Sequence, residues 1–220
     1  MTLLRVGVIG AGAMGANHAR VYSRMPGVEL VGVVDKDASV ASRVAASCAC
    51  VPDTAIRELF ARGVHAVSVA LPTSLHADTA LEAMTRGVHV LVEKPVAESV
   101  ALAEHMTVAA EKAGVRFMVG HIERFNPAVR KLKTCVDEGL LGDVVSMSAR
   151  RVGPYNPRVR DAGVILDLAT HDINVMTHLV DGPVRRVYAT AGAVRHGRED
   201  HAILTLTFEN GAIGVIETNL

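Results

Sequence analysis

The segment that decides the fold of the first half of the chain reads Val6-Gly7-Val8-Ile9-Gly10-Ala11-Gly12-Ala13-Met14-Gly15. Its apolar start predicts a strand over residues 3–9, and the stretch beyond it predicts a helix over residues 14–25. Gly10, Gly12 and Gly15 form a G-x-G-x-x-G pattern where the two elements join. The first glycine permits a tight turn, the second lets the backbone approach a pyrophosphate, and the third lets the helix pack closely on the strand. The segment therefore predicts a dinucleotide site at the start of that helix, where free N–H groups face the anion.

A carboxylate follows the glycine pattern at the distance that such a site requires. Asp35 comes twenty residues after Gly15, directly after a strand predicted over residues 28–34. A carboxylate there accepts a hydrogen bond from the ribose 2′-hydroxyl and repels a 2′-phosphate. Lys36 is the next residue, and a cation beside the carboxylate leaves NADP open. We expect NAD as the cofactor, with NADP as the alternative.

The rest of the first 120 residues alternates apolar runs with stretches of helical period. Further strands are predicted over residues 64–71, 88–92 and 115–119, and further helices over residues 38–47, 75–86 and 99–112. Strands as continuously apolar as these belong to a parallel sheet that is covered on both faces. Their alternation with helices predicts an α/β fold, a doubly wound Rossmann sheet over residues 1–121.

The pattern changes after Gly120. Helices are predicted over residues 127–138 and 164–180, and strands over residues 144–151, 184–194, 202–208 and 212–218. Asn126 is a predicted N-cap with Pro127 in the first helical position. Asn210-Gly211 between two alternating runs predicts a hairpin. Residues 122–220 are therefore predicted to form an α+β domain with an open, mainly antiparallel sheet, which serves substrate binding and oligomerisation.

The last predicted strand runs to the end of the sequence at Leu220. A hairpin at the edge of a sheet exposes unpaired backbone groups unless another strand or subunit covers it. We expect that a partner completes this sheet, or that the second domain is incomplete.

Charge and cysteine content exclude several classes of function. Lys plus Arg and Asp plus Glu both number 23 among 220 residues, which gives no general attraction to nucleic acid or anionic membrane. Cys48 and Cys50 have no second pair to complete a zinc site, so we expect reduced thiols and no metal. No apolar run reaches the ~18 residues of a membrane helix, and no signal peptide precedes the first strand. These features predict a cytoplasmic protein.

Polar side chains gather where predicted strands end, which is where doubly wound sheets bind ligands. The three segments are Leu71-Pro72-Thr73-Ser74-Leu75-His76, Glu93-Lys94-Pro95 and Gly120-His121-Ile122-Glu123-Arg124-Phe125-Asn126. Further along, Asp167 and His171 are four residues apart in a predicted helix, so both lie on one face.

With these motifs the chain resembles the Gfo/Idh/MocA oxidoreductases. The matching segments are the glycine pattern, P-T-S-L-H from Pro72 to His76, E-K-P from Glu93 to Pro95, and D-L-A-T-H-D from Asp167 to Asp172. The resemblance implies a Rossmann domain, a second domain whose open sheet supports homo-oligomers, and a cis bond before Pro95. Members of the family are usually longer, which implies that the final strands and helix of the substrate domain are lacking here.

The family's catalytic residues match Lys94, Asp167 and His171. They imply hydride transfer between a nicotinamide cofactor and a sugar or cyclitol hydroxyl. His171 is a natural base because an imidazole titrates near neutral pH, and Lys94 can stabilise negative charge on the reacting oxygen. Asp167 could bind the substrate or orient the imidazole. Which of Lys94 and His171 takes the proton stays open.

The motifs and the resemblance together give two predicted sets of ligand-binding residues. The cofactor set is Gly10, Ala11, Gly12, Ala13, Met14, Gly15, Asp35, Lys36, Leu71, Pro72, Thr73, His76, Glu93 and Lys94. The substrate set is Lys94, Arg124, Asn126, Tyr155, Asp167 and His171. His76 and Asn126 have an alternative interpretation as capping groups at helix starts.

The segments G-H-I-E-R-F-N-P and R-R-V-G-P-Y-N-P-R look most like those of family members that oxidise the 3-hydroxyl of a UDP-N-acetylhexosamine. The alternatives are an inositol or simple-sugar dehydrogenase and a catalytically silent dinucleotide-binding or assembly module. A basic segment is predicted to be a solvated face, although a phosphorylated or nucleotide-linked substrate would also use it. Its residues are Arg150, Arg151, Arg158 and Arg160.

Overall fold

A computed structural model describes residues 2–153, 163–194 and 197–219 of the chain. Tyr155, Arg158 and Arg160, which the sequence proposed for substrate or basic-segment roles, lie outside the described residues. The described residues form two compact units, Met1–Gly120 and His121–Leu220. The sequence placed the boundary one residue later, between residues 121 and 122.

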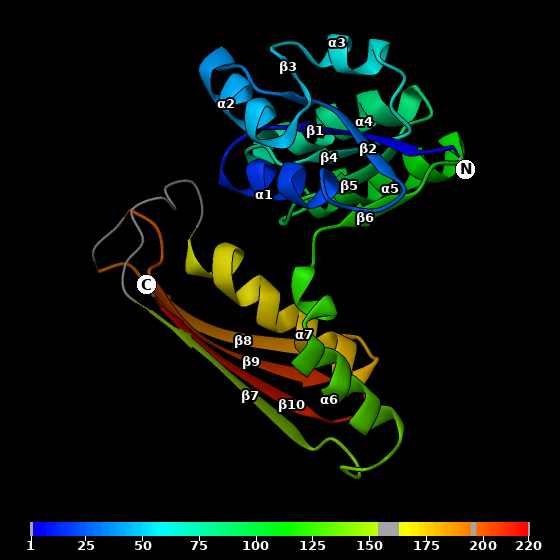
Figure 1. The fold of residues 1–220 in the computed structure, drawn as a ribbon. Helices are drawn as coiled ribbons and strands as arrows, with labels where there is room; N and C mark the ends of the chain where they lie inside the picture. Colours follow the sequence, from blue (N-terminus) through cyan, green and yellow to red (C-terminus); the bar gives the residue numbers. More distant parts are fainter. Residues whose placement is uncertain (1, 154–162, 195–196, 220) are drawn as a thin grey trace. The chain divides into compact units, whose positions relative to one another are not determined.

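The first unit contains a six-stranded parallel sheet in the order β3-β2-β1-β4-β5-β6 (Figure 1). Its strands are β1 (Leu4–Ile9), β2 (Val28–Val34), β3 (Val51–Asp53), β4 (Ala66–Val69), β5 (His89–Val92) and β6 (Phe117–Val119). Its helices are α1 (Ala13–Tyr22), α2 (Ala38–Cys48), α3 (Ile56–Ala61), α4 (His76–Thr85) and α5 (Val100–Ala113), with a 3-10 turn, η1 (Thr73–Leu75). The predicted Rossmann sheet is confirmed, because both the parallel pairing and the strand order are those of that fold.

Two apolar cores lie on opposite faces of this sheet. Val6 and Val8 of β1 pack with residues of α1 and α2, whereas Ile9 packs with residues of α3, α4 and α5. Side chains along a strand alternate between faces, so a strand covered on both sides must be apolar throughout. The sequence missed β3 and α3. β3 spans Val51–Asp53 at the edge of the sheet, includes Pro52 and is too short to show a period.

The second unit contains a four-stranded sheet in the order β7-β10-β9-β8, in which β7 and β10 are parallel and the other neighbours antiparallel. The strands are β7 (Ser146–Val152), β8 (Val184–Gly192), β9 (His201–Phe208) and β10 (Ile213–Asn219). The helices are η2 (Ile122–Phe125), α6 (Pro127–Asp137), the π-helical turn η3 (Ile165–Ala169) and α7 (Thr170–Val180). The predicted α+β architecture with a mainly antiparallel sheet is confirmed.

The sequence suggested that the last strand lies at the edge of the sheet, and this prediction is wrong. β10 runs between β7 and β9, with Ile213 opposite Ser146 on one side and Thr207 on the other (Figure 1). The predicted hairpin forms with Gly211 at φ +89° and the Asn210 side chain accepting a hydrogen bond from the Ala212 N–H. Its outer partner β7 comes from far earlier in the chain, and a local pattern cannot reveal such a pairing.

One face of this sheet is covered and the other is open. Leu204, Leu206 and Phe208 of β9 are buried in a core that includes Met176 of α7. The alternate residue Ile203 is exposed, as are Val215 of β10 and Tyr188 of β8. The open face is thus partly apolar.

Candidate functional site

The glycine pattern forms the loop between β1 and α1. Gly10 has φ +92°, and a Cβ atom there would lie 2.4 Å from the Ala70 carbonyl oxygen. A Cβ atom on Gly15 would lie 1.7 Å from the Gly10 oxygen, so the helix approaches the loop as closely as a glycine allows. Beside Gly12 there is open space for 4 Å. These properties fit a dinucleotide, because the loop offers its backbone and the first turn of α1 to a pyrophosphate with no side chain between them.

Asp35 is anchored beside this loop. One oxygen of its carboxylate accepts a hydrogen bond from the Ala11 N–H (2.8 Å), and the other accepts one from the Asp37 N–H (3.0 Å). Each oxygen keeps a second lone pair, so the carboxylate can still accept a bond from a ribose hydroxyl. Lys36 is exposed at the next position.

The remaining residues of the predicted cofactor set follow strands that are neighbours in the sheet. The strand order places β2, β1, β4 and β5 side by side, so the loops after them share one edge. Those loops carry Asp35 and Lys36 after β2, Gly10 to Gly15 after β1, Leu71 to His76 after β4, and Glu93 and Lys94 after β5. The sheet therefore brings segments that are distant in sequence to a single margin.

His76 joins two of these loops. Its side chain is buried, with Nδ1 2.9 Å from the Pro95 carbonyl oxygen and Nε2 2.8 Å from the Leu71 carbonyl oxygen. Both partners are acceptors, and a neutral imidazole donates to only one at a time. The capping interpretation is wrong, because the N-cap of α4 is Leu75 and no side chain caps it. The ring instead fixes the loop after β4 to the turn after β5.

Glu93 and Lys94 belong to the turn after β5, and the Lys94–Pro95 peptide bond is cis, as the resemblance implied. One Glu93 oxygen lies 2.9 Å from His18 Nε2, and the other accepts a hydrogen bond from the Lys94 N–H (3.3 Å). Burial raises the pKa of this carboxyl, but the hydrogen bond and charge of His18, together with the backbone N–H and charge of Lys94, outweigh it and hold the pKa below the usual range. Glu93 is thus a half-buried carboxylate next to Lys94.

The sequence missed His18. Its second ring nitrogen lies 3.0 Å from the fully buried Ser68 hydroxyl, which lies 2.7 Å from the Tyr22 hydroxyl. Four side chains thereby form one hydrogen-bonded chain from α1 to Glu93. The only sequence signal was the place of His18 one turn after Gly15, and its partners come from β4 and from the end of β5.

In the second unit, Asp167 lies in the π-helical turn and His171 in the first turn of α7. The predicted helix over residues 164–180 is therefore present but begins with a π turn, a feature that is frequent at functional sites. Both side chains are half-buried. Their spacing places them on the same side of the helical segment.

The two other described candidates for substrate contact lie near α6. Arg124 donates from Nε to the Asn174 side-chain oxygen of α7 (2.8 Å). Asn126 is the N-cap of α6, since its side chain accepts a hydrogen bond from the Ala128 N–H (3.0 Å) and donates to Glu123 (3.1 Å). The capping interpretation of Asn126 is confirmed.

The basic segment is not a uniform solvated face. Arg150 pairs with Glu217 across β7 and β10 (2.9 Å). Arg151 donates from Nε and Nη2 to the two oxygens of the buried Asp172 carboxylate (3.0 and 2.9 Å). The hydrogen bond to Asp172 also raises the pKa of Arg151. Asp172 directly follows His171, so this pair fixes the start of α7 to β7.

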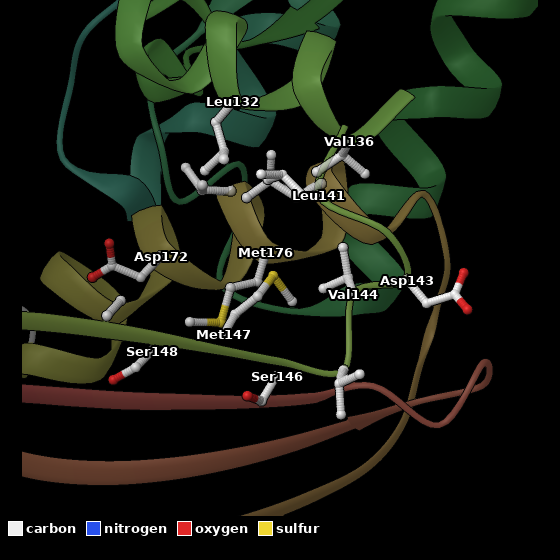
Figure 2. Close-up of a pocket in the computed structure, with 14 residues that line it drawn as sticks. Leu132, Val136, Leu141, Asp143, Val144, Ser146, Met147, Ser148, Asp172 and Met176 are labelled. Atoms are coloured by element: carbon white, nitrogen blue, oxygen red, sulfur yellow. The ribbon is translucent and has the colours of Figure 1, made fainter. Parts of the chain in front are cut away.

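A cavity of about 490 Å³ lies along β7, between α6 and α7 (Figure 2). Leu132 and Val136 of α6, Met147 of β7 and Met176 of α7 contribute to its mainly apolar lining. Such a lining offers few hydrogen-bond partners to a polar ligand, and Asp172 is already paired with Arg151. The candidate residues of each unit are therefore the polar ones described above.

Among the residues that the structure describes, no group of three or more His, Cys, Asp or Glu side chains could hold a metal ion. Within the same residues, no helix is both long and apolar enough to span a membrane.

Two family models match the chain. The oxidoreductase family GFO_IDH_MocA, described as an NAD-binding Rossmann fold, matches residues 4–121, and the GFO/IDH/MocA C-terminal domain matches residues 129–220. The predicted NAD-binding Rossmann domain is thereby confirmed for the first unit.

Relatives with curated names match nearly the whole chain. A UDP-N-acetylglucosamine 3-dehydrogenase from Acidithiobacillus ferrooxidans is 34% identical over 97% of this chain and 66% of its own length. Inositol 2-dehydrogenase 4 from Saccharopolyspora erythraea is 32% identical over the same shares, 97% and 66%. The chain thus spans 66% of the length of these relatives.

Solved structures show the same fold. The WlbA dehydrogenase from Bordetella pertussis, solved in complex with NADH and UDP-GlcNAcA, is 27% identical to this chain. It superimposes with a TM-score of 0.90 over 99% of this chain and 67% of its own.

Proposed function

The chain belongs to the Gfo/Idh/MocA oxidoreductase family, and on this premise we propose that it transfers hydride between NAD and a hydroxyl of a sugar or cyclitol. The observation that carries the proposal is the Asp35 carboxylate, which is hydrogen-bonded to Ala11 in the glycine loop. That contact holds an acceptor for a ribose hydroxyl beside the pyrophosphate cradle. A carboxylate at this place also favours NAD over NADP, because it repels a 2′-phosphate.

Bound NAD supplies the hydride acceptor, and the proton chemistry falls to side chains of the chain. We assign these roles to Lys94, Asp167 and His171. His171 takes the proton from the reacting hydroxyl, as an imidazole does well near neutral pH. Lys94 donates a hydrogen bond to the same oxygen and stabilises the negative charge that develops there. Asp167 lies on the His171 side of the helical segment and orients the imidazole or the sugar.

For the substrate, we propose the 3-hydroxyl of a UDP-N-acetylhexosamine. Two relatives support this choice, one named as a UDP-N-acetylglucosamine 3-dehydrogenase and one solved with a UDP-sugar acid. An inositol or simple sugar is the second candidate, favoured by the relative named as an inositol dehydrogenase. A catalytically silent dinucleotide-binding or assembly module is the third candidate.

We further propose that the protein forms homo-oligomers through the open face of the β7–β10 sheet. The exposed side chains of Tyr188, Ile203 and Val215 support this, since a partner would cover their apolar surface. We propose the cytoplasm as its compartment, supported by the three free cysteines Cys48, Cys50 and Cys135.

Calorimetric titration with NADH and with NADPH tests the cofactor. We expect NADH to bind more tightly than NADPH. Asp35→Ala should lower the affinity for NADH and reduce the difference in affinity between NADH and NADPH. Turnover is then measured with UDP-N-acetylglucosamine and with free inositols. Lys94→Ala should abolish turnover with NADH affinity largely kept. Undiminished turnover in that variant would refute the catalytic assignment, and failure of the folded chain to bind either cofactor would favour the assembly module.

A further inference from the structure

The side of the helical segment that carries Asp167 and His171 continues along α7. His171, Asn174 and His178 are spaced by three and four residues, so they lie on one side of the helix. Asn174 is the residue that accepts the hydrogen bond from Arg124. The seven residues from His171 to His178 correspond to about 10 Å along the helix axis.

At the His178 end of this face is a cavity of about 340 Å³ with a cationic lining. Its walls come from η2, α6 and α7, and its residues are Arg124, Phe125, Arg130, Lys133, Thr134 and His178. Three of these six side chains are permanently cationic at neutral pH. Asp137 offsets part of that charge, because it pairs with Lys133 one turn along α6.

The arginines retain donors for a ligand. Arg124 donates a hydrogen bond from Nε to the Asn174 side-chain oxygen, which orients its guanidinium group. The two terminal nitrogens can then donate hydrogen bonds to a ligand. Among the described residues no acidic side chain lies within ion-pair distance of Arg130, which is exposed on α6. Planar guanidinium groups bind phosphate oxygens through paired hydrogen bonds. Phe125 is 57% exposed at the same cavity and offers an aromatic face to a base.

We propose that this cavity binds the diphosphate of a nucleotide-linked sugar whose reacting hydroxyl lies at His171. The inference rests on the proposed function and deepens it by selecting a nucleotide sugar over a free cyclitol. A hexose ring joined to a diphosphate spans about the 10 Å that seven helical residues provide, so one substrate reaches both places. A free inositol has no group that would use three cations.

Binding is measured by calorimetry with UDP and with inorganic pyrophosphate as probes, at fixed ionic strength. We expect saturable binding of both probes, with weak or undetectable binding of uridine. Arg130→Ala should lower the affinity for UDP about tenfold or more, the usual effect of losing a charged hydrogen bond. Lys131→Ala is the matched control, because Lys131 is an exposed cation on the same helix that does not line the cavity. It should change UDP affinity less than about twofold by loss of long-range charge alone.

NADH also contains a pyrophosphate, so its site must be distinguished from this one. Saturating NADH should leave UDP affinity unchanged, and Arg130→Ala should leave NADH affinity unchanged. In turnover, Arg130→Ala should raise the KM for UDP-N-acetylglucosamine about tenfold with little change in kcat, since uniform binding energy is lost.

If Arg130→Ala and Lys131→Ala lowered the affinity for UDP equally, the inference would be overturned. The cavity would then be part of a solvated cationic surface and not a specific diphosphate site. Competition between UDP and NADH would overturn it as well, because the probe would then occupy the glycine loop. UDP binding is measured without turnover. The titrations therefore test the diphosphate site independently of the proposed catalytic function. If NADH does not bind, the proposed function fails while the diphosphate site is still decided by the UDP titrations.

Discussion

The two sheets of this chain face their surroundings differently, and their polar groups are anchored differently as a result. The β1–β6 sheet is apolar on both faces, and its candidate functional groups lie in loops beyond the strand ends, each held by at least one backbone contact. Asp35 accepts from Ala11, His76 bridges two carbonyl oxygens, and Glu93 accepts from Lys94. The β7–β10 sheet has one open face, and its nearby polar groups are held by side-chain pairs such as Arg151 with Asp172.

This difference shows how each unit builds precision. Backbone contacts place the groups of the first unit as accurately as the strands themselves, which suits a cofactor of constant shape. Side-chain pairs place the groups of the second unit through residues that a few substitutions can replace. The predictions below test whether the two kinds of anchoring respond differently to substitution.

The largest effect is expected at Gly15. A Cβ atom there would meet the Gly10 carbonyl oxygen at 1.7 Å, and backbone cannot move aside as a flexible side chain can. Gly15→Ala should abolish NADH binding and cost about 3 kcal/mol of stability or more, the upper end of the cost of overpacking. Gly12→Ala is the matched control: its Cβ meets open space, so thermal stability should be kept while NADH binding is weakened. Equal melting temperatures for the two variants would contradict this account of the loop.

Breaking the main side-chain anchor of the second unit should have the next largest effect. Arg151→Leu leaves the Asp172 carboxylate, 8% exposed, without its bidentate partner. We expect a loss of about 2–3 kcal/mol in urea unfolding, somewhat below the cost for a fully buried pair because the guanidinium is partly exposed. Arg151→Leu combined with Asp172→Leu should recover part of the loss. A double variant less stable than the single one would show that the carboxylate has another role.

His18→Leu should act through the ionisation of Glu93. The folded-state pKa of Glu93 lies below its usual range, so its contribution to stability is present above the ordinary carboxyl pKa and is lost as pH falls through the folded value. Without His18, burial is opposed only by the backbone N–H and charge of Lys94, so the pKa of Glu93 should rise. The carbon-13 resonance of the Glu93 carboxyl, followed against pH, measures this directly. An unchanged titration would mean that the His18 contact does not determine the ionisation.

The smallest effect is expected at Arg150, the neighbour of Arg151 on β7. Its partner Glu217 lies on the open side of the sheet, and the Arg150 side chain is 70% exposed. Arg150→Ala should change the free energy of unfolding by less than about 1 kcal/mol, as is usual for exposed ion pairs. The measurement is the same urea titration used for Arg151→Leu. Similar losses for the two arginines would remove the distinction between an anchoring pair and a surface pair.

Much of the fold could be predicted because its signals are local. The glycine pattern, the continuous apolar strands and the Asn126-Pro127 cap each depend on residues close together in sequence. The same holds for Asp35, whose spacing from Gly15 predicts its place beside the loop. The short β3 strand and the π turn at Asp167 were missed, because neither changes the hydrophobic period enough to be read.

By itself, the sequence determined the class of each unit, the cradle at Gly10 to Gly15 and the candidate residues at the strand ends. Local periodicity and the steric freedom of glycine act within a few residues, so they can be recognised in a single sequence. Only the tertiary structure decided that β10 lies inside its sheet, that His76 bridges two loops, and that His18 reaches Glu93. Those outcomes depend on pairings between distant segments, whose free energy comes from shared burial and hydrogen bonding that no local pattern records.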